Sequence, residues 1–123
     1  MTKIYRVSLW VGAIFLAAAF VLAGVLKLVG IPALRWSERF AHWGYPANAS
    51  YVVGVLEILG GLGVLIPQWR CAASLALGAI MVGAAITHVV NDEFPRVVPP
   101  LVLGAVALLI CWAHRRASHR RGT

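Results

Sequence analysis

Residues 7–29, VSLWVGAIFLAAAFVLAGVLKLV, begin with 20 residues that carry no charge. An α-helix rises about 1.5 Å per residue and the hydrocarbon core of a bilayer is about 30 Å thick, so a spanning helix needs about 20 apolar residues. The run is also longer than the apolar core of a secretory signal peptide, which has roughly 7–15 residues. We therefore interpret it as a transmembrane helix that is retained.

Three further apolar segments follow, at residues 48–66, 71–90 and 97–113. Over its 123 residues the chain is 61% hydrophobic and only 12% charged, whereas soluble domains carry charge on roughly a quarter of their residues. The connections at 67–70 and 91–96 are short, so the helices that they join are expected to run antiparallel. The sequence predicts an all-α fold: one transmembrane domain over residues 1–123, with four spans in a bundle and a tail at 114–123.

Between the first two spans, residues 30–47 are long enough to hold structure of their own. Aromatic side chains recur there at helical spacing, at Trp36, Phe40 and Trp43. The opposite face is polar, with Arg35, Glu38, Arg39 and His42. This pattern is typical of a short amphipathic helix that lies in the membrane interface, and we expect it to act as an interfacial lid.

Basic residues are distributed unequally between the two sides of the predicted bundle. Seven of the eleven lie on the side of the termini: Lys3, Arg6, Arg70, Arg115, Arg116, Arg120 and Arg121. Three lie on the other side, at Arg35, Arg39 and Arg96, and Lys27 lies inside a span. Because basic loops are retained in the cytoplasm, we expect a protein of the cell inner membrane with both termini cytoplasmic.

The basic tail directly follows a span, and such clusters usually bind anionic lipid. We therefore expect membrane lipids, and no nucleic acid, as its partners. The expected lipid anchor consists of Arg115, Arg116, Arg120 and Arg121.

Polar residues within the spans are the candidates for function, because a charge inside a membrane helix costs several kcal/mol unless it is paired or used. Lys27, Glu57 and His88 all fall in the outer halves of their spans, so we expect them to converge, with Asn91 and Asp92 extending the polar edge outward. A Lys27–Glu57 ion pair, a proton or ligand site at Glu57, and a purely structural polar network remain open.

Cys71 and Cys111 are too few for a disulfide framework, and no Cys/His spacing typical of zinc occurs, so no metal site is expected. The simplest interpretation is that both are small packing residues. A redox pair is geometrically possible, because both fall near the cytoplasmic ends of their spans, but it would lie in a reducing compartment.

Several motifs together resemble the DoxX-like family. They are AGVLKL at residues 23–28, FAHWGYP at 40–46, GVLEILGG at 54–61 and GAAITH at 83–88. The resemblance covers residues 20–105, and the placement of Lys and Glu is its most specific part. It implies a compact four-helix membrane protein. Some members are small subunits of a thiosulfate:quinone oxidoreductase, and others are maturation or assembly factors.

Neither a catalytic motif nor a set of intrinsic cofactor ligands is recognisable, so we lean against an enzyme in its own right. The first hypothesis is an accessory or assembly subunit of a larger respiratory or photosynthetic membrane complex, with a quinone or lipid pocket in the outer half. The alternative is a membrane component of a quinone-linked oxidoreductase. A small-solute or proton transporter is a third hypothesis, weakened by the lack of a detectable inverted repeat.

Overall fold

The computed structural model describes residues 2–122, and the side chains of residues 2–119; these residues form five α-helices and one short 3-10 turn. The helices are α1 (Lys3–Leu28), α2 (Gly30–His42), α3 (Ala49–Val64), α4 (Arg70–Val90) and α5 (Val98–Gly122), and the turn is η1 (Phe94–Val97). The all-α class is thereby confirmed, and each predicted span overlaps one helix.

Three helical segments are long and apolar enough to cross a membrane: Lys3–Leu28, Arg70–Val90 and Phe94–His119. Helix α3 is equally apolar but has only 16 residues, so it is about 24 Å long. The predicted span at 48–66 is therefore a shorter helix than the sequence suggested. This shortening follows from the turn that begins at its end, because Leu65 and Ile66 already donate their amides to Leu62 and Gly63.

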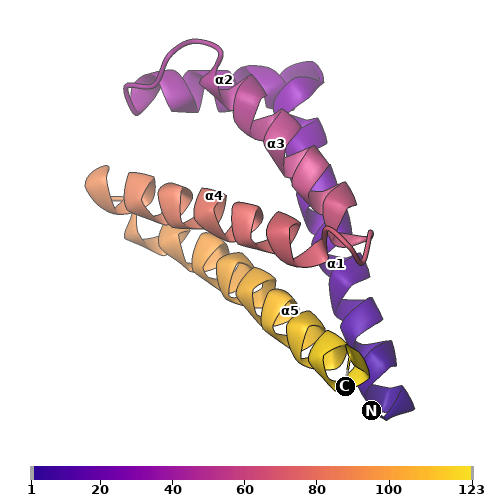
Figure 1. The fold of residues 1–123 in the computed structure, drawn as a ribbon. Coiled ribbons are helices and arrows are strands. Elements are labelled where there is room, and N and C mark those ends of the chain that lie inside the picture. Colours follow the sequence, from indigo (N-terminus) through magenta and orange to yellow (C-terminus); the bar gives the residue numbers. More distant parts are fainter. Residues whose placement is uncertain (1, 123) are drawn as a thin grey trace.

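Helices α1 and α3 pack against each other along their length through small residues (Figure 1). A Cβ added at Gly24 would lie 2.5 Å from the carbonyl oxygen of Gly54, and one at Gly61 would lie 3.1 Å from that of Ala17. Close backbone approach of this kind is the usual basis of helix association in membranes, where burial of apolar surface gives little driving force. The α1–α3 seam thus requires glycine at these positions.

Helices α4 and α5 form the second pair (Figure 1). Cys71 and Cys111 are joined in a disulfide across this pair, with their Cα atoms 4.3 Å apart. The interpretation of both cysteines as simple packing residues is therefore wrong: the two residues are paired, and redox activity of the pair stays a prediction. Near the other end of the pair, a Cβ on Gly104 would lie 3.3 Å from that of Met81.

The two helix pairs meet at the end of the molecule that carries the termini and diverge away from it (Figure 1). Where they meet, Tyr5 of α1 donates from its hydroxyl group to the carbonyl oxygen of Ala113 at 3.1 Å. The apolar core lies between the pairs in this region: Leu9, Ala13, Leu16, Phe20, Val64, Leu77, Met81, Ala107, Ile110 and Ala117. Both termini lie at this end, as the predicted topology requires.

Helix α2 crosses the opposite end of the molecule (Figure 1). Glycines in the left-handed region lie at both of its ends, Gly30 with φ of 69° and Gly44 with φ of 91°, a conformation that other residues adopt only at a cost. They allow the chain to turn sharply into α2 and out again. A helix in the 30–47 segment is thereby confirmed, and its location in the membrane interface stays a prediction.

The C-terminal segment differs from the expected tail. Helix α5 does not end near residue 113 but continues to Gly122, because residues 114–122 contain neither glycine before position 122 nor proline that would stop it. Arg115 and Arg116 are exposed, as a lipid anchor would be. The side chains of Arg120 and Arg121 lie outside the described residues.

Candidate functional site: two polar clusters joined by an aromatic row

Lys27 and Glu57 form an ion pair between α1 and α3. Lys27 Nζ lies 2.7 Å from Glu57 Oε1, and the two side chains are only 8% and 3% exposed. The pair follows directly from the glycine seam, because the approach of Gly24 to Gly54 brings the next turn of each helix together. The Lys27–Glu57 ion pair, one of the alternatives that the sequence left open, is present in the fold.

This pair is closed off by an aromatic ring. Trp36 of α2 places its ring 4.2 Å from Lys27 Nζ, and Arg39 stacks on the same ring at 4.9 Å. Glu57 Oε1 is buried and makes no hydrogen bond with favourable geometry in addition to the ion pair. Attraction between a cation and an indole face increases when water is excluded, so Trp36 stabilises the ammonium group that neutralises Glu57.

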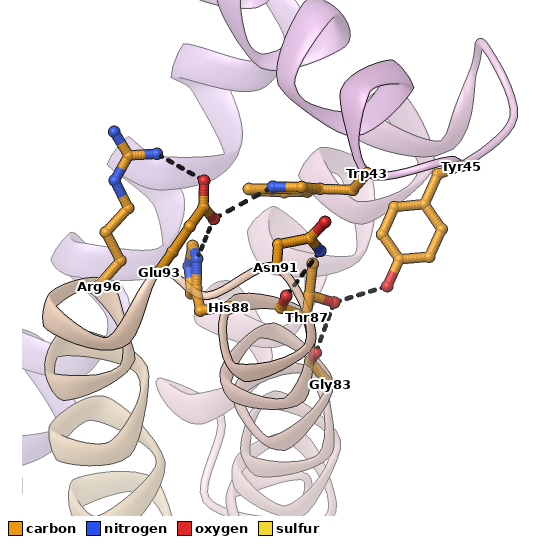
Figure 2. Close-up of polar contacts among 8 residues, drawn as sticks. All are labelled: Trp43, Tyr45, Gly83, Thr87, His88, Asn91, Glu93 and Arg96. Atoms are coloured by element: carbon orange, nitrogen blue, oxygen red, sulfur yellow. Dashed lines mark hydrogen bonds and ion pairs between the residues drawn. The ribbon is translucent and has the colours of Figure 1, made fainter.

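His88 does not join this pair but belongs to a second cluster centred on Glu93 (Figure 2). Glu93 Oε1 lies 3.0 Å from His88 Nδ1 and accepts a hydrogen bond from Trp43 Nε1 at 3.1 Å. Arg96 Nη1 donates to Glu93 Oε2 at 3.4 Å. The expected convergence of Lys27, Glu57 and His88 on one point is therefore replaced by two clusters.

Glu93 was not among the residues singled out by the sequence. It lies in the turn after α4, where an acidic residue beside an arginine is usually a solvated loop charge. The one sequence feature that could have identified Glu93 as a site residue is its proximity in the chain to His88, five residues earlier. The hydrogen bond from His88 is the main reason that the pKa of Glu93 lies below its ordinary value, with Arg96 and Trp43 acting in the same direction and partial burial opposing them.

The end of α4 is fixed by further hydrogen bonds (Figure 2). The hydroxyl groups of Tyr45 and Thr87 are hydrogen-bonded to each other, and Thr87 also donates to the carbonyl oxygen of Gly83 at 2.8 Å. Asn91 Nδ2 donates to the carbonyl oxygen of Thr87 at 2.8 Å, so this side chain caps its own helix. Asp92 is exposed, with φ of 58° in the turn. Neither Asn91 nor Asp92 contributes to the Lys27–Glu57 pair.

The aromatic side chains of α2 and of Trp43, which directly follows it, form a row that connects the two clusters. Trp36 contacts Phe40 at 6.2 Å between ring centroids, and Phe40 contacts Trp43 at 5.3 Å. Trp43 in turn meets the ring of His88 edge-on at 5.3 Å. The three residues expected to form a lid thus run from Lys27 at one end to His88 at the other, and their action as a lid stays a prediction.

A small hollow lies on α2 itself. It is lined by Pro32, Arg35, Trp36 and Arg39, and not by the polar residues of the three spans that were expected to line a pocket. Among the described residues, no group of three or more His, Cys, Asp or Glu side chains could hold a metal ion.

The comparison with known proteins agrees with the motifs around these two clusters. The model of the DoxX-like family matches residues 11–110, which include the glycine seam, the ion pair, the aromatic row and His88. The chain belongs to the DoxX-like family. With its several long apolar helices, this DoxX-like protein is a multi-pass membrane protein. No curated protein and no solved structure matches the chain.

Proposed function

We propose that this DoxX-like protein is an accessory or assembly subunit of a larger respiratory or photosynthetic membrane complex, in the inner membrane with both termini cytoplasmic. The observation that carries the proposal is an unpartnered face of α4. Small residues follow one another there at intervals of three and four, at Ala72, Ala76, Ala79 and Gly83, and all are exposed. We call these four residues the α4 stripe.

The α4 stripe points away from the rest of the chain. At 100° per residue it lies opposite the buried face of the helix, which consists of Ser74, Leu77, Gly78, Met81 and Ala85. A Cβ added at Gly83 would meet no atom within 4 Å. Within lipid, stripes of small residues allow a second helix to approach closely, so the α4 stripe suits a helix of another membrane subunit.

The polar groups in the spans support the same proposal. Lys27 and Glu57 neutralise each other, and Trp36 covers Lys27, so this pair holds two helices together without leaving an open charge. Its location in the outer half would also suit a lipid or quinone head group bound near the aromatic row, with Lys27 and Trp36 as its neighbours.

The proposal is tested by copurification. Membranes are solubilised in mild detergent, and the tagged chain is expected to migrate with a much larger assembly that contains other membrane proteins. Gly83→Leu places a large side chain on the α4 stripe and should release the chain from that assembly. Val82→Phe is the matched control, because Val82 is exposed on the same helix but lies beside the stripe. A monodisperse free chain, or an assembly of this chain alone, would contradict the proposal.

A second candidate, a membrane component of a quinone-linked oxidoreductase, is favoured by the contact of His88 with Glu93 and Trp43. Histidine transfers protons near neutral pH, and an aromatic neighbour suits a quinone ring. In this case His88→Gln should abolish quinone-dependent turnover of the purified complex while the chain remains assembled in it. Unchanged turnover would exclude this candidate and leave the accessory role intact.

A further inference from the structure

The disulfide between Cys71 and Cys111 lies at the end of the α4–α5 pair nearest the termini. Cys71 is the second residue of α4 and is partly exposed, whereas Cys111 is 5% exposed. Cys71 is therefore the more accessible member of the pair, and Cys111 is sheltered. This asymmetry is what a pair that opens and closes by thiol exchange requires.

The residue that precedes the pair is a buried cation. Arg70 is 2% exposed, donates from Nε to the carbonyl oxygen of Val64 at 2.7 Å, and stacks on Trp10 at 4.3 Å. Its Nη1 lies 3.5 Å from Nδ1 of His114, which follows Cys111 by one helical turn. Arg70 therefore places a positive charge at the start of α4, and its guanidinium group contacts the ring of His114 on α5.

One donor atom of the Arg70 guanidinium group has no hydrogen-bond partner in the described part of the chain. Arg70 Nη2 is buried and has no hydrogen-bond partner among the described residues. Leaving a buried charged donor unpaired is costly, so this group favours a negative charge within its reach. Cationic side chains and helix N-termini stabilise thiolates, and Cys71 directly follows Arg70 in the first turn of α4.

We propose that Cys71 and Cys111 are a redox-active pair that exchanges electrons with a small membrane-permeable dithiol. The proposal is independent of the accessory role. A thiolate of the dithiol attacks Sγ of Cys71, the Cys71–Cys111 bond breaks, and Cys111 leaves as a thiolate. The second thiol of the dithiol then closes a disulfide within that molecule and releases Cys71. Two electrons and two protons pass from the dithiol to the pair.

The expected location of the pair agrees with this chemistry. The excess of basic residues puts the termini, and with them Cys71 and Cys111, on the cytoplasmic side. Disulfides in that compartment are usually transient, with catalytic or sensing roles. A purely structural cross-link would instead be expected where no reductant reaches it.

The experiment uses the full chain in lipid nanodiscs, oxidised and then exposed to dithiothreitol. Samples are quenched with acid, free thiols are labelled with a maleimide that adds mass, and the reduced fraction is read on a gel. We expect the folded chain to be reduced within about tenfold of the rate measured in SDS, because Cys71 is partly exposed. Reduction only in SDS, or two free cysteines after oxidation, would overturn the proposal.

The role of the buried cation is tested on the same readout. Arg70→Gln should slow alkylation of the reduced pair at neutral pH on the order of tenfold and move its pH profile upward, because thiolate is the reactive form. Arg70→Lys should restore most of the rate. The matched control is Lys3→Gln, because Lys3 is an exposed cation of α1 near the same end.

If Arg70→Gln does not fold, His114→Gln takes its place and should slow alkylation by a smaller factor. Wild-type alkylation rates in the variants that fold would refute the assignment of Arg70 and His114.

Discussion

The two polar clusters of the outer half differ in how far they are removed from water. Lys27 and Glu57 are enclosed between α1 and α3 and covered by Trp36, whereas the side chain of Glu93 is 23% exposed in a turn. A buried pair depends on both of its members, since either one alone is an uncompensated charge. A solvated cluster tolerates change better but responds to pH. The first cluster therefore acts as a permanent clamp, and the second acts as a latch that holds α2 against α4.

The largest effect is expected from breaking the clamp on one side. Lys27→Met leaves Glu57 buried without its counter-charge, and removal of one member of a buried pair typically costs about 3–5 kcal/mol. The free energy of unfolding, measured by SDS titration in mixed micelles with circular dichroism, should fall by this order.

The matched control for this change is the double variant Lys27→Met/Glu57→Gln, which removes both charges. It should recover much of the lost stability, because an uncharged amide costs less to bury than a carboxylate. Equal destabilisation of the single and double variants would show that the stem of Lys27, and not its charge, provides the stabilisation.

A smaller effect is expected from the glycine seam that brings the clamp together. Gly24→Ala adds a Cβ that would lie 2.5 Å from a backbone oxygen of Gly54, so the two helices must separate. Overpacking of this kind costs typically about 1–3 kcal/mol, measured by the same titration. Gly83→Ala is the control, since the space around Gly83 is open and alanine favours a helix. A loss of stability in Gly83→Ala equal to that in Gly24→Ala would refute the role of the seam.

The Lys27–Glu57 clamp could be predicted from the sequence, whereas the Glu93 latch could not, for a physical reason. Depth in the membrane is set by position along an apolar run, so the antiparallel order of the spans predicts that Lys27 and Glu57 meet. The partner of His88 depends instead on the fold of the turn after α4, where Asp92 adopts a positive φ and Glu93 turns back. Apolar length carries no information on such a turn.

The burial of Arg70 could not be predicted from the sequence either, because it also depends on tertiary contacts. In the sequence it lies in a four-residue connection and counts as a cytoplasmic charge, but in the fold it begins α4 and packs beneath Trp10. Long-range side-chain contacts with Trp10 of α1 and His114 of α5 decide its environment. Packing of α4 against α5, which is equally long-range, places Cys71 against Cys111, forty residues apart in the chain.

The smallest effect is expected from titrating the latch. The pKa of Glu93 is lower in the folded chain than its ordinary value of 4.5, chiefly through the hydrogen bond with His88. A carboxyl group of this kind stabilises the fold fully above its unfolded pKa, and the contribution disappears as the pH falls through the folded pKa. The contribution of Glu93 to the attachment of α2 to α4 should therefore be present above about pH 4.5 and weaken below it. Trp43 fluorescence, recorded in a variant whose other tryptophans are phenylalanine, reports the change.

The control is Glu93→Gln, which should lose this transition because the amide does not titrate. A transition that persists in Glu93→Gln would assign it to another carboxyl group and contradict the role of Glu93 in the latch.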